Sequence, residues 1–181
     1  AMKASGDKFV MITAYDATFA RLVSEAGAET ILVGDSLGMV LQGHETTIPV
    51  SLDAMTYHTE CVARARPHSL IVADLPFMSF SNSDDTLHAS TRLMQAGAQM
   101  VKLEGGTWLS DSIHRLVERG VPVCAHLGLT PQSVNVFGGY RVQGRTPKEA
   151  KSILADAVEI QDAGASLLVL ECIPAELAAD I

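Results

Sequence analysis

The sequence predicts a parallel α/β protein, and within that class a (β/α)8 or TIM barrel. Short apolar runs alternate with longer helical patterns along the 181 residues, as repeated βα units require. The tripeptide Ala-Gly-Ala recurs at 26–28, 96–98 and 163–165, each time between a predicted helix and the next strand. Its glycine suits the left-handed turn that ends a helix. Polar or charged residues follow almost every strand, which is typical of a barrel whose site lies at the carboxyl ends of the strands.

The elements follow one another in a regular order. The apolar runs 31–33 and 167–170 are continuous, which predicts strands buried on both faces. Serine or threonine begins three of the helices as a predicted N-cap: Ser51, Ser83 and Thr146. The predicted strands are 9–13, 30–34, 69–74, 99–104, 121–126 and 166–172. The predicted helices are 17–26, 51–65, 84–96, 108–119 and 147–163.

The residues after the first strand favour a barrel over a doubly wound sheet. A dinucleotide-binding sheet would favour a glycine-rich turn there, but the strand runs into Thr-Ala-Tyr-Asp at 13–16, without glycine. A closed barrel needs eight strands and typically about 250 residues, whereas six strands are visible. We therefore expect residues 1–181 to form a single barrel domain that lacks the last strands.

Composition excludes several classes of function. The net charge of −8 argues against a nucleic-acid surface, which needs a basic face. No apolar run approaches the roughly 20 residues that cross a membrane. Cys61, Cys124 and Cys172 are far apart and lack metal-like spacing. They indicate reduced thiols in a cytoplasmic protein.

Three carboxylates follow or end neighbouring strands: Asp35, Asp74 and Glu104. Hard oxygen ligands of this kind suit Mg²⁺, which takes a few carboxylates and keeps several waters. The alternative is that Asp35 and Asp74 cap the turns or helices after their strands. The three together, beside a lysine, favour a metal site.

Lys102 and Glu104 lie two residues apart in one strand, so both side chains point to the same face. Two functional interpretations stay open for Lys102. It forms a Schiff base with a carbonyl substrate, or it stays protonated and stabilises a carboxylate or a developing enolate oxygen. We expect it to pair with Glu104, which favours a charged lysine.

Two further residues end strands. Glu171 follows the apolar run 167–170, and a poorly solvated carboxylate there suits a general base. The alternative is a partly solvated residue at the rim. His126 ends its strand and could donate a hydrogen bond to a substrate, or it could be a structural histidine.

Several long motifs together resemble one known family, ketopantoate hydroxymethyltransferase. The resemblance spans residues 13 to 174 and rests on ordered segments rather than on single residues. These segments are Val-Gly-Asp-Ser-Leu-Gly-Met at 33–39, Gln-Gly-His at 42–44, Ala-Asp-Leu-Pro-Phe-Met at 73–78, Val-Lys-Leu-Glu-Gly-Gly at 101–106, His-Leu-Gly-Leu-Thr-Pro-Gln-Ser at 126–133, Phe-Gly-Gly-Tyr at 137–140, Val-Gln-Gly-Arg at 142–145 and Leu-Glu-Cys-Ile-Pro at 170–174.

The resemblance implies a Mg²⁺-dependent barrel enzyme of the phosphoenolpyruvate mutase and isocitrate lyase group. Such an enzyme transfers a hydroxymethyl group from 5,10-methylenetetrahydrofolate to 3-methyl-2-oxobutanoate, giving 2-dehydropantoate for pantothenate synthesis. It implies a cytoplasmic homo-oligomer, often a decamer.

The resemblance also assigns roles to individual residues. It places Asp35, Asp74 and Glu104 at the metal, and Glu171 as the catalytic base. The residues expected to contact the keto acid are Asp35, Ser36, Asp74, Lys102 and His126.

The sequence departs from the family at its ends. The family's short helical segment before the first strand is missing, and so are its last two strands. The enzymatic alternative is a Schiff-base aldolase that uses Lys102. The alternative from another class is a barrel that binds a keto acid without catalysis.

Overall fold

The computed structural model describes residues 2–181, and its centre is one parallel sheet of six strands. All six predicted strands are confirmed, each within two residues at either end. The strands are β1 (Met11–Thr13), β2 (Thr30–Val33), β3 (Leu70–Asp74), β4 (Met100–Glu104), β5 (Val123–Gly128) and β6 (Leu167–Glu171).

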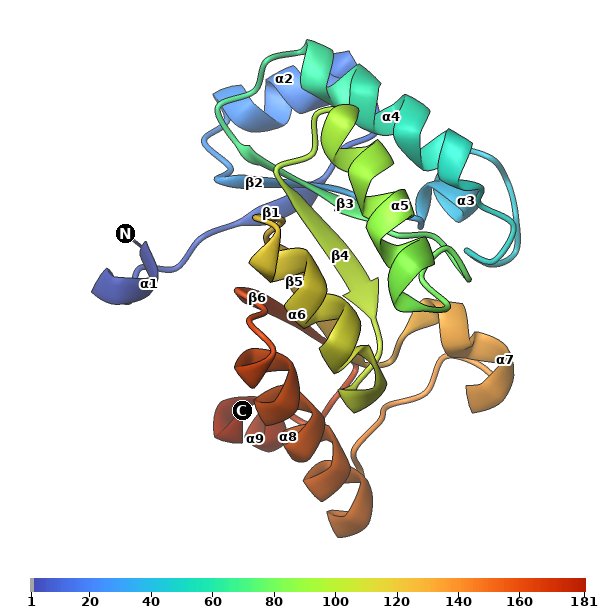
Figure 1. The fold of residues 1–181 in the computed structure, drawn as a ribbon. Helices are drawn as coiled ribbons and strands as arrows, with labels where there is room; N and C mark the ends of the chain where they lie inside the picture. The colour runs from blue at the N-terminus through green and yellow to red at the C-terminus, as the bar shows by residue number, and fades with distance from the viewer. Residues whose placement is uncertain (1) are drawn as a thin grey trace.

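The strand order in the sheet is β1-β2-β3-β4-β5-β6, so each strand pairs with its neighbours in the chain. A doubly wound sheet would reverse this order at a switch point. The sequential order is instead that of a barrel wall, and the predicted (β/α)8 class is confirmed for the six strands present. Figure 1 shows this curved sheet with helices covering its outer face.

The covering helices also follow the chain order. Helices α2, α4, α5, α6 and α8 each connect consecutive strands, and α4 with α5 and α5 with α6 pack side by side (Figure 1). Within residues 2–181, no helix combines the length and the apolar character needed to cross a membrane. The helices are α1 (Met2–Ser5), α2 (Ala17–Glu25), α3 (Leu37–Val40), α4 (Leu52–Arg64), α5 (Ser83–Gln95), α6 (Ser110–Glu118), α7 (Val134–Phe137), α8 (Pro147–Asp162) and α9 (Ala175–Asp180), with 3₁₀ turns η1 (Thr107–Leu109) and η2 (Pro131–Ser133).

The helix caps show where local prediction succeeds. Ser51 accepts from the Ala54 amide, and Thr146 forms a capping box with Glu149, both as predicted. The prediction of Ser83 as a cap was wrong. Asn82 caps α5 instead, because its side chain accepts from two backbone amides of the first turn. A single turn of helix, α1, precedes β1, where the sequence predicted no helical segment.

Alternation along the strands divides the core into two layers. One face of the sheet packs against the helices through residues such as Ile71, Val101 and Ala125. The inner face carries a small apolar layer of Val72, Met100 and Cys124. The next inward-facing positions along β3, β4 and β5 are the polar residues Asp74, Lys102 and His126. Each of these three residues lies two positions after a residue of the apolar layer. The polar side chains therefore form the next layer, towards the carboxyl ends of the strands.

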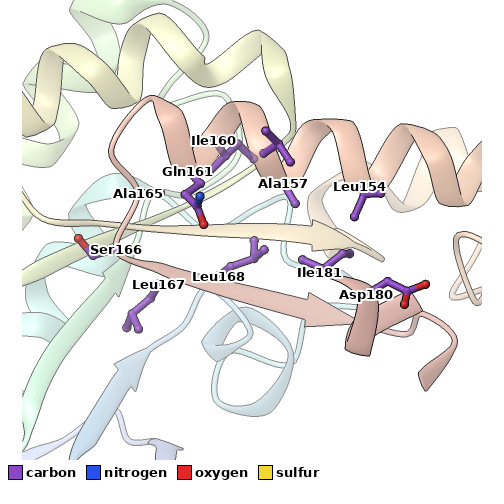
Figure 2. A pocket seen from close by; sticks show the side chains of 11 residues that line it. Leu154, Ala157, Ile160, Gln161, Ala165, Ser166, Leu167, Leu168, Asp180 and Ile181 are labelled. Atoms are coloured by element: carbon purple, nitrogen blue, oxygen red, sulfur yellow. The ribbon is translucent and has the colours of Figure 1, made fainter. Parts of the chain in front are cut away.

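Strand β6 differs from its prediction. Its apolar residues 167–170 were expected to be buried on both faces, yet all are only partly buried. The reason is that, within residues 2–181, β6 lies at the edge of the sheet and pairs with β5 alone. A groove of about 320 Å³ lies beside it, where Leu168 faces Ala157 and Ile160 of α8 (Figure 2).

Candidate active site

The strand register brings the predicted site residues together. Asp74 on β3 lies beside Lys102 on β4, and Glu104 on β4 lies beside His126 on β5. These four side chains and Asp35, which follows β2, are all at most 5% exposed. Residues far apart in the chain therefore form one buried polar cluster at the carboxyl ends of four strands.

Lys102 pairs with Asp74 rather than with Glu104. Its Nζ lies 2.6 Å from Asp74 Oδ1, whereas the sequence predicted Glu104 as the partner. The register explains the difference, because Asp74 is the direct cross-strand neighbour of Lys102. Burial acts to lower the pKa of Lys102, but the carboxylates of Asp74 and Glu104 outweigh it and raise that pKa. Lys102 is therefore an ammonium ion at neutral pH.

Asp35 sits among the other acids. Its backbone amide donates to Asp74 Oδ2 at 3.1 Å, so Asp74 is held by Lys102 on one oxygen and by Asp35 on the other. Burial, together with the charges of Asp74 and Glu104, raises the pKa of Asp35 to about 7. Asp35 and Asp74 do not act as helix caps here, because their oxygens face the cluster.

Gln132 joins two of the carboxylates, and sequence reasoning did not identify it as a site residue. Its side-chain Nε2 donates to Asp35 Oδ2 at 2.8 Å and to the carbonyl of Leu75 at 2.9 Å. Its backbone amide donates to Glu104 Oε2 at 3.0 Å. Gln132 follows β5 in the 3₁₀ turn η2 and is buried. The indication that the sequence offered was that Gln132 is a polar residue within the 126–133 motif.

His126 lies between two carboxylates. Its Nδ1 is 3.4 Å from Glu104 Oε1, and its Nε2 is 3.4 Å from Glu171 Oε2. Burial acts to lower the pKa of His126, but Glu104 and Glu171 outweigh it and raise that pKa. The imidazole thus lies between Glu104 and Glu171 and connects the cluster to Glu171.

Glu171 and Ser36 lie at the more open side of the site. The Glu171 side chain is 40% exposed, so it is better solvated than its place after an apolar run predicted. Ser36 is partly buried and its Oγ lies 2.9 Å from the Tyr15 hydroxyl, on the loop after β1. Ser36 directly follows Asp35 in the chain, and Glu171 lies beside His126. Both residues are therefore next to the buried cluster.

Gly128 explains how β5 and β6 come close enough for this arrangement. It is the register partner of Glu171 and has a positive φ of 87°. A Cβ at this position would collide with the Glu171 carbonyl oxygen and lie 2.6 Å from Ile173 Cγ2. Glycine is therefore required here for both conformation and space.

Three carboxylates in the cluster face a single lysine. The described part of the chain contains no group of three or more His, Cys, Asp or Glu side chains already arranged around a metal position. Mg²⁺ does not need such a cage, because it keeps several waters and takes few protein carboxylates. The hard oxygen donors Asp35, Asp74 and Glu104, with their excess negative charge, therefore suit Mg²⁺.

Solved structures with this fold are similar in shape but distant in sequence. A phosphonopyruvate hydrolase superposes with a TM-score of 0.73 at 17% identity, covering 97% of this chain and 63% of that one. A 2,3-dimethylmalate lyase of the phosphoenolpyruvate mutase/isocitrate lyase superfamily gives 0.70 at 17% identity, covering 98% and 64%. These likenesses establish the fold alone.

Sequence relatives are much closer. The 3-methyl-2-oxobutanoate hydroxymethyltransferase of Marinobacter nauticus is 60% identical over 179 residues, which are 99% of this chain and 68% of the relative. The enzyme of the same name from Colwellia psychrerythraea is 60% identical over 176 residues, covering 97% and 67%. The chain thus spans about two thirds of the length of these relatives. The family model for ketopantoate hydroxymethyltransferase matches residues 1–181. The chain therefore belongs to the ketopantoate hydroxymethyltransferase family.

Proposed function

We propose that this chain transfers a hydroxymethyl group from 5,10-methylenetetrahydrofolate to 3-methyl-2-oxobutanoate and forms 2-dehydropantoate. The observation that carries the proposal is the buried cluster of Asp35, Asp74, Glu104 and protonated Lys102, which His126 connects to Glu171. The names of relatives that are 60% identical support the same reaction.

Asp35, Asp74 and Glu104 would hold the Mg²⁺ ion. When bound, the ion polarises the keto group of the substrate and so makes the neighbouring carbon more acidic. The raised pKa of Asp35 supports this assignment, because it reflects burial first and then the negative charges of Asp74 and Glu104, which Lys102 only partly compensates. A divalent cation would compensate that charge.

We assign proton removal, enolate stabilisation and substrate contact to side chains of the chain itself. Glu171 takes the proton from C3 of the keto acid, which leaves an enolate, and the enolate carbon then bonds to the methylene carbon of the folate. The two bonds from that carbon to the folate nitrogens break, and a water molecule supplies the hydroxyl oxygen. The second proton of the water and the proton from C3 end on the two nitrogens, which leave as tetrahydrofolate. The Lys102 ammonium stabilises the negative oxygen electrostatically. His126 orients Glu171, since its Nε2 lies 3.4 Å from that carboxylate. Ser36 and His126 contact the substrate.

The geometry disfavours a Schiff-base aldolase. A nucleophilic lysine must lose its proton, whereas Lys102 lies 2.6 Å from Asp74 and its pKa is raised. A barrel that binds the keto acid without catalysis would not need a carboxylate in the position of Glu171.

Assembly and location belong to the same proposal. Phe19 and Leu22 on α2 are 60% and 56% exposed, which supports a homo-oligomer that covers them. The three cysteines are unpaired, which supports a reducing cytoplasm.

We also propose that residues 1–181 form part of one barrel domain, because all strands share one sheet.

Deuterium exchange at C3 of 3-methyl-2-oxobutanoate tests the reaction without the folate. The complete protein with Mg²⁺ should exchange this hydrogen with solvent deuterium, as followed by proton NMR, and EDTA should stop the exchange. Borohydride added with substrate should trap no adduct. A covalent adduct on Lys102, or undiminished exchange in EDTA, would reject the metal-assisted mechanism.

The variant Asp35→Asn tests whether Asp35 is a metal ligand without disrupting the fold. The variant removes a buried carboxylate whose pKa is about 7, and its Oδ1 can still accept from Gln132. A raised pKa in the folded state means that this carboxyl makes stability fall as pH rises from about 4 to 7. Without Mg²⁺ at pH 8, the variant should therefore melt on the order of 5 °C higher than the wild type.

Added Mg²⁺ should raise the melting temperature of the wild type and leave that of Asp35→Asn unchanged. Asp53→Asn, at an exposed carboxylate on α4, is the matched control and should keep the Mg²⁺ effect. Equal stabilisation of Asp35→Asn by Mg²⁺ would show that Asp35 is not a ligand.

A further inference from the structure

A ledge of exposed apolar side chains borders the site beside Glu104. It consists of Phe77 and Met78, which follow β3, and Trp108 in η1, which are 40%, 62% and 62% exposed. Phe80 supports it from beneath and is 5% exposed. Large side chains exposed together next to a polar site indicate a surface that a ligand or partner covers.

Trp108 is held in a fixed orientation although most of it faces solvent. Its indole stacks on the Phe80 ring, with centroids 6.0 Å apart and planes 14° from parallel. On the backbone side it lies against Gly105, where a Cβ would come within 2.6 Å of the indole Cζ2. Gly105 directly follows Glu104, so the indole that packs on this glycine lies beside the carboxylate cluster.

Met78 is displayed at a conformational cost. Its φ of 61° lies in the left-handed region, which is unfavourable for a residue with a side chain. The neighbouring structure holds it there, and the side chain ends up largely exposed. Strain of this kind concentrates where a side chain must face a ligand.

A cavity joins the ledge to the site. It has a volume of about 130 Å³, and its lining includes Phe77, Met78, Phe80 and Trp108 together with Glu104 and Gln132. Complete small-molecule sites are larger, at about 300–1,000 Å³. The cavity therefore suits one ring of a larger ligand, with the remainder of that ligand outside.

We propose that the ledge binds the pterin of the folate donor by stacking its flat pyrimidinone ring on Trp108. The inference rests on the proposed function, in which two substrates must meet at the cluster. The keto acid is small and anionic and gains little from an aromatic wall, whereas the pterin carries a planar, polarisable pyrimidinone ring. A ring stacked on Trp108 beside Glu104 places the adjoining methylene group next to the carbon that attacks it.

Trp108 is the only tryptophan in residues 1–181, and any fluorescence change that Trp108→Phe abolishes reports on the ledge. Titration of the complete protein with tetrahydrofolate should quench this fluorescence, after correction for folate absorption. In calorimetry, Trp108→Ala should weaken tetrahydrofolate binding about tenfold or more, as loss of a stacking partner does. Trp108→Phe, which keeps an aromatic face, should recover part of the affinity.

Two other variants guard against a general effect on folding. Met78→Gly relieves the left-handed strain while removing the side chain, so it should fold as well as the wild type and still bind tetrahydrofolate more weakly. Tyr57→Ala, at a 61% exposed ring on α4, should bind it as the wild type does. All three ledge variants should retain C3 exchange of the keto acid without folate.

Wild-type tetrahydrofolate affinity in Trp108→Ala would overturn the proposal. So would a change in oligomeric state in that variant at unchanged folate affinity, which would identify the ledge as an interface between copies of the chain. Absence of C3 exchange in the wild type would instead reject the proposed reaction, and binding of tetrahydrofolate at Trp108 would still be measured independently.

Discussion

Replacing Glu171 by glutamine should lower the rate of C3 deuterium exchange about 10²- to 10⁴-fold, the range that a general base contributes. The amide has the size of the carboxylate but cannot take a proton. The residue is partly exposed, so the variant should keep the fold. Binding of 3-methyl-2-oxobutanoate, measured by calorimetry, should change little.

Glu176→Gln is the matched control. Glu176 is an exposed carboxylate in the first turn of α9, five residues further along the chain. Its exchange rate should equal that of the wild type. Undiminished exchange in Glu171→Gln would remove the base assignment, whereas loss of keto-acid binding along with exchange would assign Glu171 a role in binding.

Replacing Lys102 by methionine should have the largest effect on stability. Methionine keeps much of the volume of the lysine stem but removes the charge, which leaves Asp74, Asp35 and Glu104 buried without their lysine. Removing one partner of a buried ion pair costs about 3–5 kcal/mol. The melting temperature without Mg²⁺ at pH 8 should fall by on the order of 10 °C.

The loss should diminish as the pH is lowered from 8 to about 5. With Lys102 present, the pKa of Asp35 is already about 7, and removal of the cation, which lowers that pKa, raises the pKa of Asp35 further. The folded state then binds more protons than the unfolded state, so acidification stabilises it. Thermal unfolding across this range measures the effect.

Arg92→Met is the control for this variant. Arg92 pairs with Asp53 at 2.6 Å, the same distance as the buried pair, but at the surface. Exposed pairs contribute little because water screens them, so its melting temperature should stay close to that of the wild type. An equal loss in both variants would show that burial does not set the strength of the Lys102 pair.

Periodicity in the sequence predicts the fold and the face on which the site lies. Residues two apart in a strand share a face, so Lys102 and Glu104 had to point the same way, and both are buried on the inner face. Cross-strand neighbours are set by register, which the sequence does not state. Asp74 therefore replaced Glu104 as the partner of Lys102.

Long-range contacts of loop residues were beyond sequence reasoning. Gln132 donates to Asp35 across 97 residues of chain, and no local pattern indicates such a contact. The burial of β6 was also mispredicted, because the apolar run 167–170 fits a central strand and an edge strand equally well.

The sequential strand order has a consequence for assembly of the protein during synthesis. Chains emerge from the N-terminus, and early units fold first. In a chain synthesised only as far as β3, Asp35 after β2 and Asp74 on β3 are present without the cation that Lys102 supplies on β4. A sheet that ends at β3 holds two adjacent acids without their cation. Docking of β4 supplies that cation, so the pairing of Lys102 with Asp74 favours β4 as the strand that joins β3.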